Sequence, residues 1–334
     1  MRISSQIPVR PLLKWAGGKR QLIPVLAEHY PLRFSRYVEP FVGSGAVFFD
    51  LLNRGRLAGR RIQLSDVNPD LIGCYWIVRD RTADVVRALK ALTREYRVDG
   101  YSCYYDVRDR RFNAQRADLR MRAANEKDIA SRYTPELAAM LIFLNRTGFN
   151  GLFRLNRTGG FNVPVGRYNN PRILDEGNLY AVAAALSTDG VSIDLAPFHE
   201  TLATAGRGDF VYCDPPYAPL SRTSSFAHYT AGGFSAFDQR RLQQAVIAAC
   251  RRGARVVVSN SSASEIVRGY TTPDAQKARL AIRPVPARRS INSRASSRGP
   301  VDELIIANVR PRPLEDVRPR MAKAQLRARK KKSA

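Results

Sequence analysis

The chain has 334 residues, enough for one large or two medium domains with a sizeable core. Its 55 Lys and Arg residues against 29 Asp and Glu residues give a formal net charge of +26, which indicates a polyanionic partner, most simply nucleic acid. No run of about twenty apolar residues appears, which excludes a membrane span. Four cysteines without C-x-x-C spacing and three scattered histidines predict neither a zinc site nor a disulfide framework.

The positive charge belongs to the body of the chain as well as to its end. Residues 309–334 carry ten Lys and Arg residues against two acids, or +8, and subtraction from +26 leaves +18 on residues 1–308. A basic tail alone is often only solvated, so the basic body is the better evidence for nucleic acid. The N-terminus lacks an apolar signal core, and we expect a cytoplasmic protein.

The first segment with a chemical signature runs from Leu12 to Arg20, before a helix expected from Leu22 to Tyr30. It places the Trp15 ring and the Lys19 amine beside a pair of glycines. A cofactor with an adenine and a carboxylate tail would use such an amine together with backbone amides. A solvated basic loop is the plain alternative, and it fits Trp15 poorly.

A strand from Arg36 to Phe41 is followed by a glycine turn and by a helix from Ala46 to Asn53. Gly43 and Gly45 allow a sharp turn and close approach of the backbone to a ligand. The turn lacks the third glycine of the dinucleotide fingerprint, so it favours an adenosyl group with a short amino-acid tail over a pyrophosphate.

A second strand, Arg61 to Leu64, leads to Asp66 and then to a helix from about Leu71 to Arg79. An acid about twenty residues after such a glycine turn binds ribose hydroxyls in nucleoside-binding α/β folds. An N-cap role for Asp66 before Pro69 is equally favoured by the sequence.

After Asp84 the pattern changes to helical spacing and polar loops, with no strand expected before Val191–Leu195. Within it, residues 147–162 mix glycines, amides, arginines and aromatic rings that we expect at the surface. Arginine can read guanine and asparagine adenine, while Leu or Phe can touch a thymine methyl or wedge into the base stack. An ordered loop packed on the rest of the protein is the alternative, and it fits Phe161 better than Arg154.

The α/β alternation then resumes with a strand ending at Cys213, a helix from Gln239 to Arg251 and a strand from Arg255 to Ser259. Two late strands, near Leu280–Val285 and Leu304–Val309, predict an antiparallel pair at one edge. The whole pattern predicts an α/β fold: a doubly wound, mostly parallel, Rossmann-like sheet interrupted by an inserted, mainly helical module.

The tetrapeptide Asp214-Pro215-Pro216-Tyr217 follows the apolar strand that ends at Cys213. Ligands of parallel sheets bind at the carboxyl ends of the strands. There Asp214 and the Pro215 carbonyl can accept hydrogen bonds from an exocyclic amine, and Tyr217 offers a ring for stacking on a base. A rigid strand-to-loop turn is the alternative. The small polar residues Ser221 to Tyr229 predict either a lid over this site or a passive loop.

Taken in order, these motifs resemble those of the Dam-type (D12 class) DNA adenine-N6 methyltransferases, which use S-adenosylmethionine. The matching blocks cover most of residues 10–309: Lys14–Lys19, Glu39–Gly45, Asp66–Asn68, Leu144–Tyr168 and Asp214–Ser221. The polar stretch from Val98 to Tyr133 and everything after Asn308 depart from the family pattern. Phe149 and Phe153 replace residues that are often Tyr and Cys in that family.

The resemblance implies a role for each matched residue. Catalysis falls to Asp214, Pro215 and Tyr217. The residues implied to bind S-adenosylmethionine are Trp15, Lys19, Glu39, Phe41, Gly43, Gly45, Asp66 and Asp214. The residues implied to face double-stranded DNA are Lys14, Phe149, Asn150, Leu152, Arg154 and Pro164.

The resemblance also implies methylation of adenine N6 in a flipped-out base, with GATC as the favoured site, without a metal or an obligate protein partner. We expect the catalytic domain in two parts, residues 1–83 and 189–309. Residues 84–188 would form the target-recognition domain, and 310–334 a basic, disordered tail.

Two other classes stay open. Cytosine-N4 methylation is chemically close, although that class more often has Ser in place of Asp214. An inactive sequence-specific DNA-binding protein would explain the charge, but not the set of cofactor-type motifs. Cytosine-C5 methylation needs a Pro-Cys pair, and the chain has none.

Overall fold

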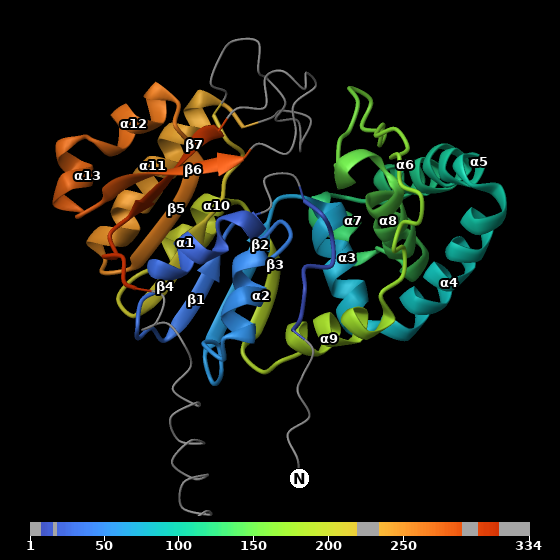
Figure 1. Cartoon of the computed structure of the whole chain (residues 1–334), viewed down its shortest axis with the longest axis horizontal. Helices are drawn as coiled ribbons and strands as arrows, with labels where there is room; N and C mark the ends of the chain where they lie inside the picture. Colours follow the sequence, from blue (N-terminus) through green and yellow to red (C-terminus); the bar gives the residue numbers. More distant parts are fainter. Residues whose placement is uncertain (1–7, 16–18, 219–233, 289–299, 314–334) are drawn as a thin grey trace, which may run out of the picture.

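A seven-stranded sheet forms the centre of the computed structural model, which describes residues 8–15, 19–218, 234–288 and 300–313 (Figure 1). The strand order is β3-β2-β1-β4-β5-β7-β6. Neighbouring strands are parallel from β3 to β5, and β7 is antiparallel to both β5 and β6. The strands are β1 (Arg36–Glu39), β2 (Arg61–Asp66), β3 (Val191–Leu195), β4 (Asp209–Cys213), β5 (Arg255–Ser261), β6 (Ala281–Arg288) and β7 (Pro300–Ala307).

Both faces of the sheet are buried, as the apolar strands predict for a doubly wound fold. Along β4, Phe210 and Tyr212 pack into one hydrophobic cluster, whereas Val211 and Cys213 pack into another. This alternation follows from the two-residue period of a strand. The first cluster includes side chains of α1 (Ile23–Glu28) and α2 (Ala46–Asn53). The second includes side chains of α10 (Phe198–Ala203), α11 (Ala236–Arg251), α12 (Ser264–Tyr270) and α13 (Pro273–Lys277).

The prediction of an antiparallel pair at one edge is confirmed, with β6 as the outermost strand. Helix α2 begins and ends where the sequence predicts, and β3 is the first strand after β2, as the sequence also predicts.

The chain between β2 and β3 is mainly helical and lies to one side of the sheet (Figure 1). Its helices share one hydrophobic cluster with the sheet, since Leu89, Phe143 and Leu64 belong to the same core. The predicted domain limits at residues 84 and 188 fall in the first turn of α4 and just after α9, and they stay predictions. The elements are α3 (Pro69–Asp80), α4 (Thr82–Asp99), α5 (Tyr101–Tyr105), the π-helix η2 (Asp106–Phe112), α6 (Asn113–Arg122), α7 (Glu126–Ser131), α8 (Pro135–Thr147), the 3-10 turn η3 (Phe149–Gly151) and α9 (Glu176–Leu186).

None of the helices in the described parts of the chain combines the length and the apolar character needed to cross a membrane.

Candidate active site and nucleic-acid interface

Three carboxyl groups lie at the carboxyl ends of neighbouring parallel strands. Glu39 ends β1, Asp66 ends β2, and Asp214 directly follows β4. Because β1 lies between β2 and β4, the topology brings the three together. Such a cluster of acids suits a ligand that carries positive charge and hydroxyl groups.

The glycine turn after β1 is tied to both neighbouring segments. Gly43 and Gly45 have φ values of 46° and 66°, which only glycine adopts without strain. The Gly43 N–H donates to Asp66 Oδ2 over 3.1 Å, and the Tyr75 hydroxyl donates to the Gly43 carbonyl over 2.7 Å. A Cβ atom at Gly43 would lie 2.9 Å from Cδ1 of Trp15, so the indole ring packs directly on the turn. The structure therefore joins the Trp15 segment to the glycine turn, as the predicted cofactor site requires.

Burial perturbs the two acids beside this turn. Burial raises the pKa of Asp66 to about 6. The hydrogen bonds that its carboxylate accepts from the Gly43 and Asn68 amides lower the pKa and so oppose part of this rise. Burial also raises the pKa of Glu39 well above its usual range, although the Tyr37 hydroxyl donates to Oε2 over 2.8 Å. Burial thus disfavours the charged form of both carboxyls, and a bound positive charge would offset that cost.

The N-cap alternative for Asp66 is wrong. Asn68 caps α3, because its side chain accepts hydrogen bonds from the amides of Asp70 and Leu71. Asp66 lies two residues earlier, at the end of the strand, and is available for a ligand role.

Asp214 forms an ion pair with Lys19, whose Nζ atom lies 2.8 Å from Oδ1. The Lys19 side chain is only 3% exposed, whereas a fifth of the Asp214 side chain remains accessible (20%). Burial raises the pKa of Asp214 to about 6, and the charge of Lys19 limits that rise. The pair brings the N-terminal motif and the tetrapeptide into one site.

Tyr217 lies in the same group. Lys19 Nζ is 4.5 Å from the centroid of the Tyr217 ring, within the range of a cation–π contact. The Tyr217 hydroxyl donates to Glu303 Oε2 over 2.5 Å. Glu303 therefore fixes the far end of the ring from strand β7.

Side chains of α11 and β5 hold the loop after β4 in place. Gln239 Nε2 donates to the Pro216 carbonyl over 2.9 Å, and the Ser261 hydroxyl donates to the Ala218 carbonyl over 2.7 Å. Asn260 in turn donates to Gln239 over 3.1 Å. The rigid-turn interpretation of the tetrapeptide is therefore compatible with the functional one, since a fixed loop orients Asp214.

Phe41 stacks on Phe198 with ring centroids 5.4 Å apart, and Phe234 meets it edge to face at 5.9 Å. The ring forms an apolar wall near the end of β1, where a flat adenine ring would find a partner.

The segment before the cofactor motif also touches the loop that was predicted to read DNA. Asn145, near the end of α8, is 2% exposed and accepts from the Lys14 amide over 2.8 Å. Its side chain also donates to the carbonyls of Lys14 (2.7 Å) and Gly151 (2.8 Å). The exposed Lys14 side chain runs along Gly151, and its Nζ atom lies 4.6 Å from the Tyr168 ring centroid.

The loop after α8 forms a narrow hairpin. Leu155 and Phe161 make an antiparallel bridge, and Asn156 Oδ1 closes the tip by accepting from Thr158 and Gly160 amides. Just below the bridge, the exposed Arg154 donates through Nε to Asn162 Oδ1 over 2.8 Å. We call residues 148–166 the reading loop.

The remaining predicted DNA-facing residues differ in exposure. Phe149 is 46% exposed, and Asn150 beside it has a φ of 54°, which presents its side chain at a tight turn. Pro164 is exposed, whereas Leu152 is half buried and packs on the core.

The expectation that the aromatic rings of this loop lie at the surface is wrong for two of them. Phe153 and Phe161 are 3% and 2% exposed. Phe153 stacks on Trp15 at 5.5 Å, and Phe161 packs against Phe112 at 5.8 Å. The packed-loop alternative thus holds for these rings, and the contact with Trp15 links the reading loop to the candidate cofactor site.

One side of the reading loop is held by the helices before it. Three side chains donate to alternate carbonyls of the loop. Arg116 donates to the Gly159 carbonyl, Asn113 to the Phe161 carbonyl and Tyr104 to the Val163 carbonyl, each over 2.9 Å. Arg116 also forms a two-pronged ion pair with Asp70 of α3 at 2.7 and 2.8 Å, with both side chains 3% exposed. These contacts fix the second arm of the hairpin against α6 and α5.

Sequence reasoning missed several residues that organise the site: Tyr75, Glu303, Asn145, Asp70 and Arg116. Their contacts join distant parts of the chain, so no local spacing pointed to them. Asp70 carried one usable signal, because it directly precedes the apolar run Leu71–Val78, and a charged residue buried in such a helix seldom lacks a partner.

Three sequence predictions lie outside the described residues or on their border: the glycine pair after Trp15, the Ser221–Tyr229 lid, and the tail beyond residue 313. Among the residues that are described, no three His, Cys, Asp or Glu side chains are grouped so as to hold a metal ion.

Comparison with known proteins places this geometry in context. The family model for the D12 class N6 adenine-specific DNA methyltransferases matches residues 15–281. Type II methyltransferase M1.LlaDCHI of Lactococcus lactis subsp. cremoris is 34% identical over 307 residues, which cover 91% of this chain and 97% of that protein. Type II methyltransferase M.MjaIII of Methanocaldococcus jannaschii is 36% identical, with 90% and 99% covered. DNA adenine methylase of Escherichia coli (strain K12) is 35% identical, with 89% and 94% covered.

Proposed function

The chain belongs to the D12 class of N6 adenine-specific DNA methyltransferases, and we propose that it transfers the methyl group of S-adenosylmethionine to adenine N6 within a specific double-stranded sequence. The observation that carries the proposal is the meeting of Lys19, Asp214 and Tyr217 at the carboxyl end of β4. The enzyme would act on a base flipped out of the duplex, with GATC as the proposed site.

The residues present fit the proposed methyl donor. The acids Glu39 and Asp66 suit its positive charge and ribose hydroxyls, and Gly43 leaves room beside the Trp15 ring. Phe41 would contact the adenine ring, and Lys19 would contact the carboxylate tail or hold Asp214. When bound, S-adenosylmethionine supplies a methyl group on a cationic sulfur.

Asp214 and Pro215 would activate the adenine. The lone pair of its exocyclic nitrogen is delocalised into the ring, which makes it a poor nucleophile. The Asp214 carboxylate accepts one N–H hydrogen bond and the Pro215 carbonyl accepts the other, so the lone pair localises on nitrogen. The nitrogen would bond to the methyl carbon while the electron pair of the carbon–sulfur bond stays with sulfur, and the proton that the nitrogen loses would pass to solvent. Tyr217 stacks on the base and holds it in line for the transfer.

Arg154, Asn150 and Lys14 would read base edges, while Phe149 and Leu152 would fill the space near the flipped base. The Asn162 side chain would fix the orientation of the Arg154 guanidinium, which favours bidentate recognition of a guanine.

Membership of the N6-adenine family disfavours cytosine N4 as the target. Calorimetry with S-adenosylmethionine distinguishes an enzyme from an inactive DNA-binding protein. We expect binding by the wild type and weaker binding by Asp66→Ala and Lys19→Ala, since each lost charged hydrogen bond is worth about 1.5–3 kcal/mol. Tyr180→Ala, an exposed change on α9, is the matched control that should bind as the wild type does. Absence of binding by the wild type would contradict the proposal.

A further inference from the structure

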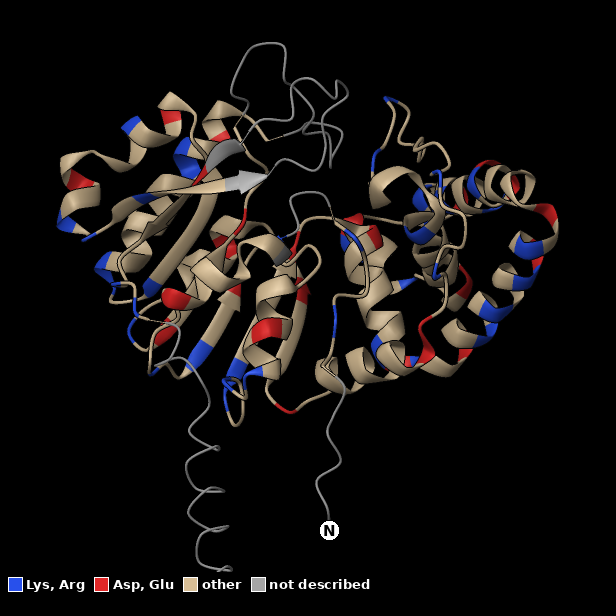
Figure 2. Cartoon of the chain, in the orientation of Figure 1, with Lys and Arg blue, Asp and Glu red and all other residues tan. Residues whose placement is uncertain are grey.

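The edge of the sheet opposite the candidate active site is rich in exposed arginines. The strands β1, β2, β4 and β5 begin there, with Arg36 paired in register to Arg61 and Asp209. Figure 2 shows Lys and Arg positions gathered at these strand starts. We call six exposed residues the arginine edge: Arg33, Arg61, Arg252, Arg255, Arg310 and Arg312.

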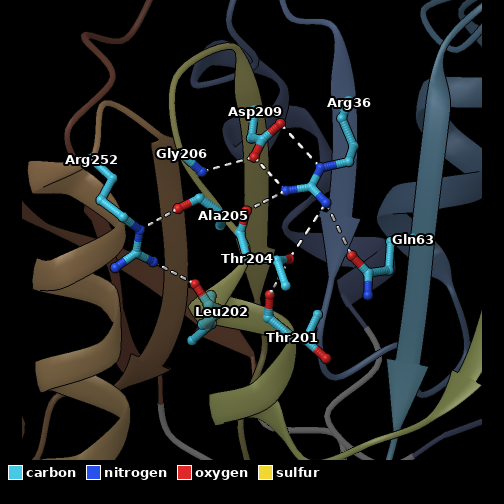
Figure 3. A network of polar contacts seen from close by, with 9 residues as sticks. All are labelled: Arg36, Gln63, Thr201, Leu202, Thr204, Ala205, Gly206, Asp209 and Arg252. Carbon is cyan, nitrogen blue, oxygen red and sulfur yellow. Dashed lines mark hydrogen bonds and ion pairs between the residues drawn. The ribbon is translucent and has the colours of Figure 1, made fainter.

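The charge of the arginine edge is not neutralised. Within the described part of the chain, none of its six guanidinium groups has a carboxylate oxygen within 4.0 Å. Instead, Arg252 donates to the carbonyls of Leu202 (2.6 Å) and Ala205 (2.8 Å), as Figure 3 shows. Carbonyl groups orient a guanidinium but leave its full positive charge.

Two acids near this edge are already engaged by other arginines. Asp209 binds Arg36 at 2.6 Å (Figure 3), and Glu28 binds Arg283 at 2.5 Å. The edge therefore contributes to the +18 carried by residues 1–308, and none of its arginines has an ion-pair partner among the described residues.

Four members of the edge surround a surface hollow of about 400 Å³: Arg33, Arg255, Arg310 and Arg312. Arg255 donates to the Arg33 carbonyl over 2.6 Å, which fixes one wall of the hollow. A phosphate group fits such a hollow, because guanidinium groups offer paired donors to its oxygens.

The edge lies at the other end of the strands from Asp214. Strand β4 has five residues, Asp209–Cys213, and spans about 16 Å at roughly 3.3 Å per residue. A straight duplex bound across the carboxyl ends of the strands would not reach the arginine edge. The arginine edge must therefore bind a different stretch of polyanion from the duplex at the carboxyl ends of the strands.

The sequence favours DNA as that anion. The described chain ends at Pro313, directly after Arg312, and residues 314–334 add eight Lys and Arg residues against two acids. The same sign of charge thus continues along the chain from the edge, as is typical of contacts to a phosphate backbone.

We propose that the arginine edge binds the phosphate backbone of a second DNA duplex while the reading loop holds the first. The inference rests on the proposed function, since it takes the reading loop as the first DNA site. It adds a second, sequence-independent site that would keep the enzyme near DNA between methylation events.

The test counts duplexes bound per chain by sedimentation, with the full chain, a labelled short duplex and low salt. The edge variant replaces Arg33, Arg255, Arg310 and Arg312 by Gln. The control replaces Arg94, Arg97, Arg268 and Lys277 by Gln, which removes the same charge from exposed positions on α4, α12 and α13.

We expect two duplexes per chain for the wild type and the control. The edge variant should bind one, with its affinity for the second lowered at least tenfold and its methylation of a short duplex within about twofold. Arg310→Glu with Arg312→Glu, both outside the strands and helices, should give the same loss if the fourfold variant does not fold. Arg154→Ala should weaken the first site and leave the second.

One duplex per chain in the wild type, or two in both edge variants, would overturn the inference. Binding of phosphatidylglycerol vesicles in place of the second duplex would overturn it as well. A wild type that binds two duplexes and methylates neither would contradict the proposed function and leave the second site intact, so the two failures are distinguishable.

Discussion

Replacing Lys19 with Met should move the acid limb of the pH–rate profile to higher pH. Activation of the adenine requires Asp214 as a carboxylate, and burial has raised its pKa to about 6. The Lys19 ammonium, 2.8 Å from Oδ1, opposes that rise. Without it the carboxyl group keeps its proton to a higher pH.

The size of the shift follows from this one contact. A hydrogen bond between charged groups is worth about 1.5–3 kcal/mol, and one pKa unit corresponds to about 1.36 kcal/mol. Loss of the pair should therefore raise the pKa of Asp214 by about 1–2 units. The acid limb would move from about pH 6 to about pH 7–8.

The assay is the initial rate of methylation of a short duplex from pH 5 to 9, with both substrates well below saturation so that the free enzyme is reported. Lys14→Met is the matched control, because it removes the other lysine of this segment, whose Nζ atom lies over Tyr168. Its rate should fall without a shift of the limb. An unmoved limb in Lys19→Met, or a shift to lower pH, would refute the reasoning.

Three further predictions concern specificity and stability. Arg154→Ala should cost about 1–3 kcal/mol of discrimination and relax one base pair of the recognised sequence, which sequencing of methylated plasmid would detect as new methylated sites. Arg116→Met should destabilise the fold by about 3–5 kcal/mol in urea unfolding, because it leaves Asp70 buried and charged. The double variant that also carries Asp70→Leu should recover part of this loss. Equal losses in the single and the double variant would contradict the prediction. Asp66 and Asp214 have folded pKa values of about 6, above the usual 3.8, so their contribution to stability is full below about pH 4 and is lost as pH rises through 6. Asp214→Asn should flatten that loss in unfolding experiments between pH 4 and 7, and a steeper loss would count against the assignment.

Local patterns predicted the parts of the fold that depend on local chemistry. Helix α2 and strand β3 have the predicted limits. A glycine turn directly precedes α2, and turn residues flank β3. The motifs at the carboxyl ends of β1, β2 and β4 come together because parallel topology places those ends side by side.

Contacts between distant segments could not be predicted in the same way. The Arg116–Asp70 pair joins α6 to α3, and the Tyr217–Glu303 hydrogen bond joins the loop after β4 to β7. The burial of Phe153 depends on Trp15, and no periodicity within the loop reports that contact. The role of Asn68 as the cap of α3 was equally hidden, since Asp66 and Asn68 both suit a cap by residue type.

The central claim is that Asp214 activates adenine N6 for methyl transfer. The most direct measurement is single-molecule sequencing of plasmid DNA from a methylation-free host that expresses either the wild type or Asp214→Ala. We expect N6-methyladenine at one defined sequence with the wild type and none with Asp214→Ala, whose affinity for a duplex should stay within a few-fold of the wild type. Methyladenine in the Asp214→Ala plasmid, or methylcytosine in the wild-type plasmid, would contradict the account.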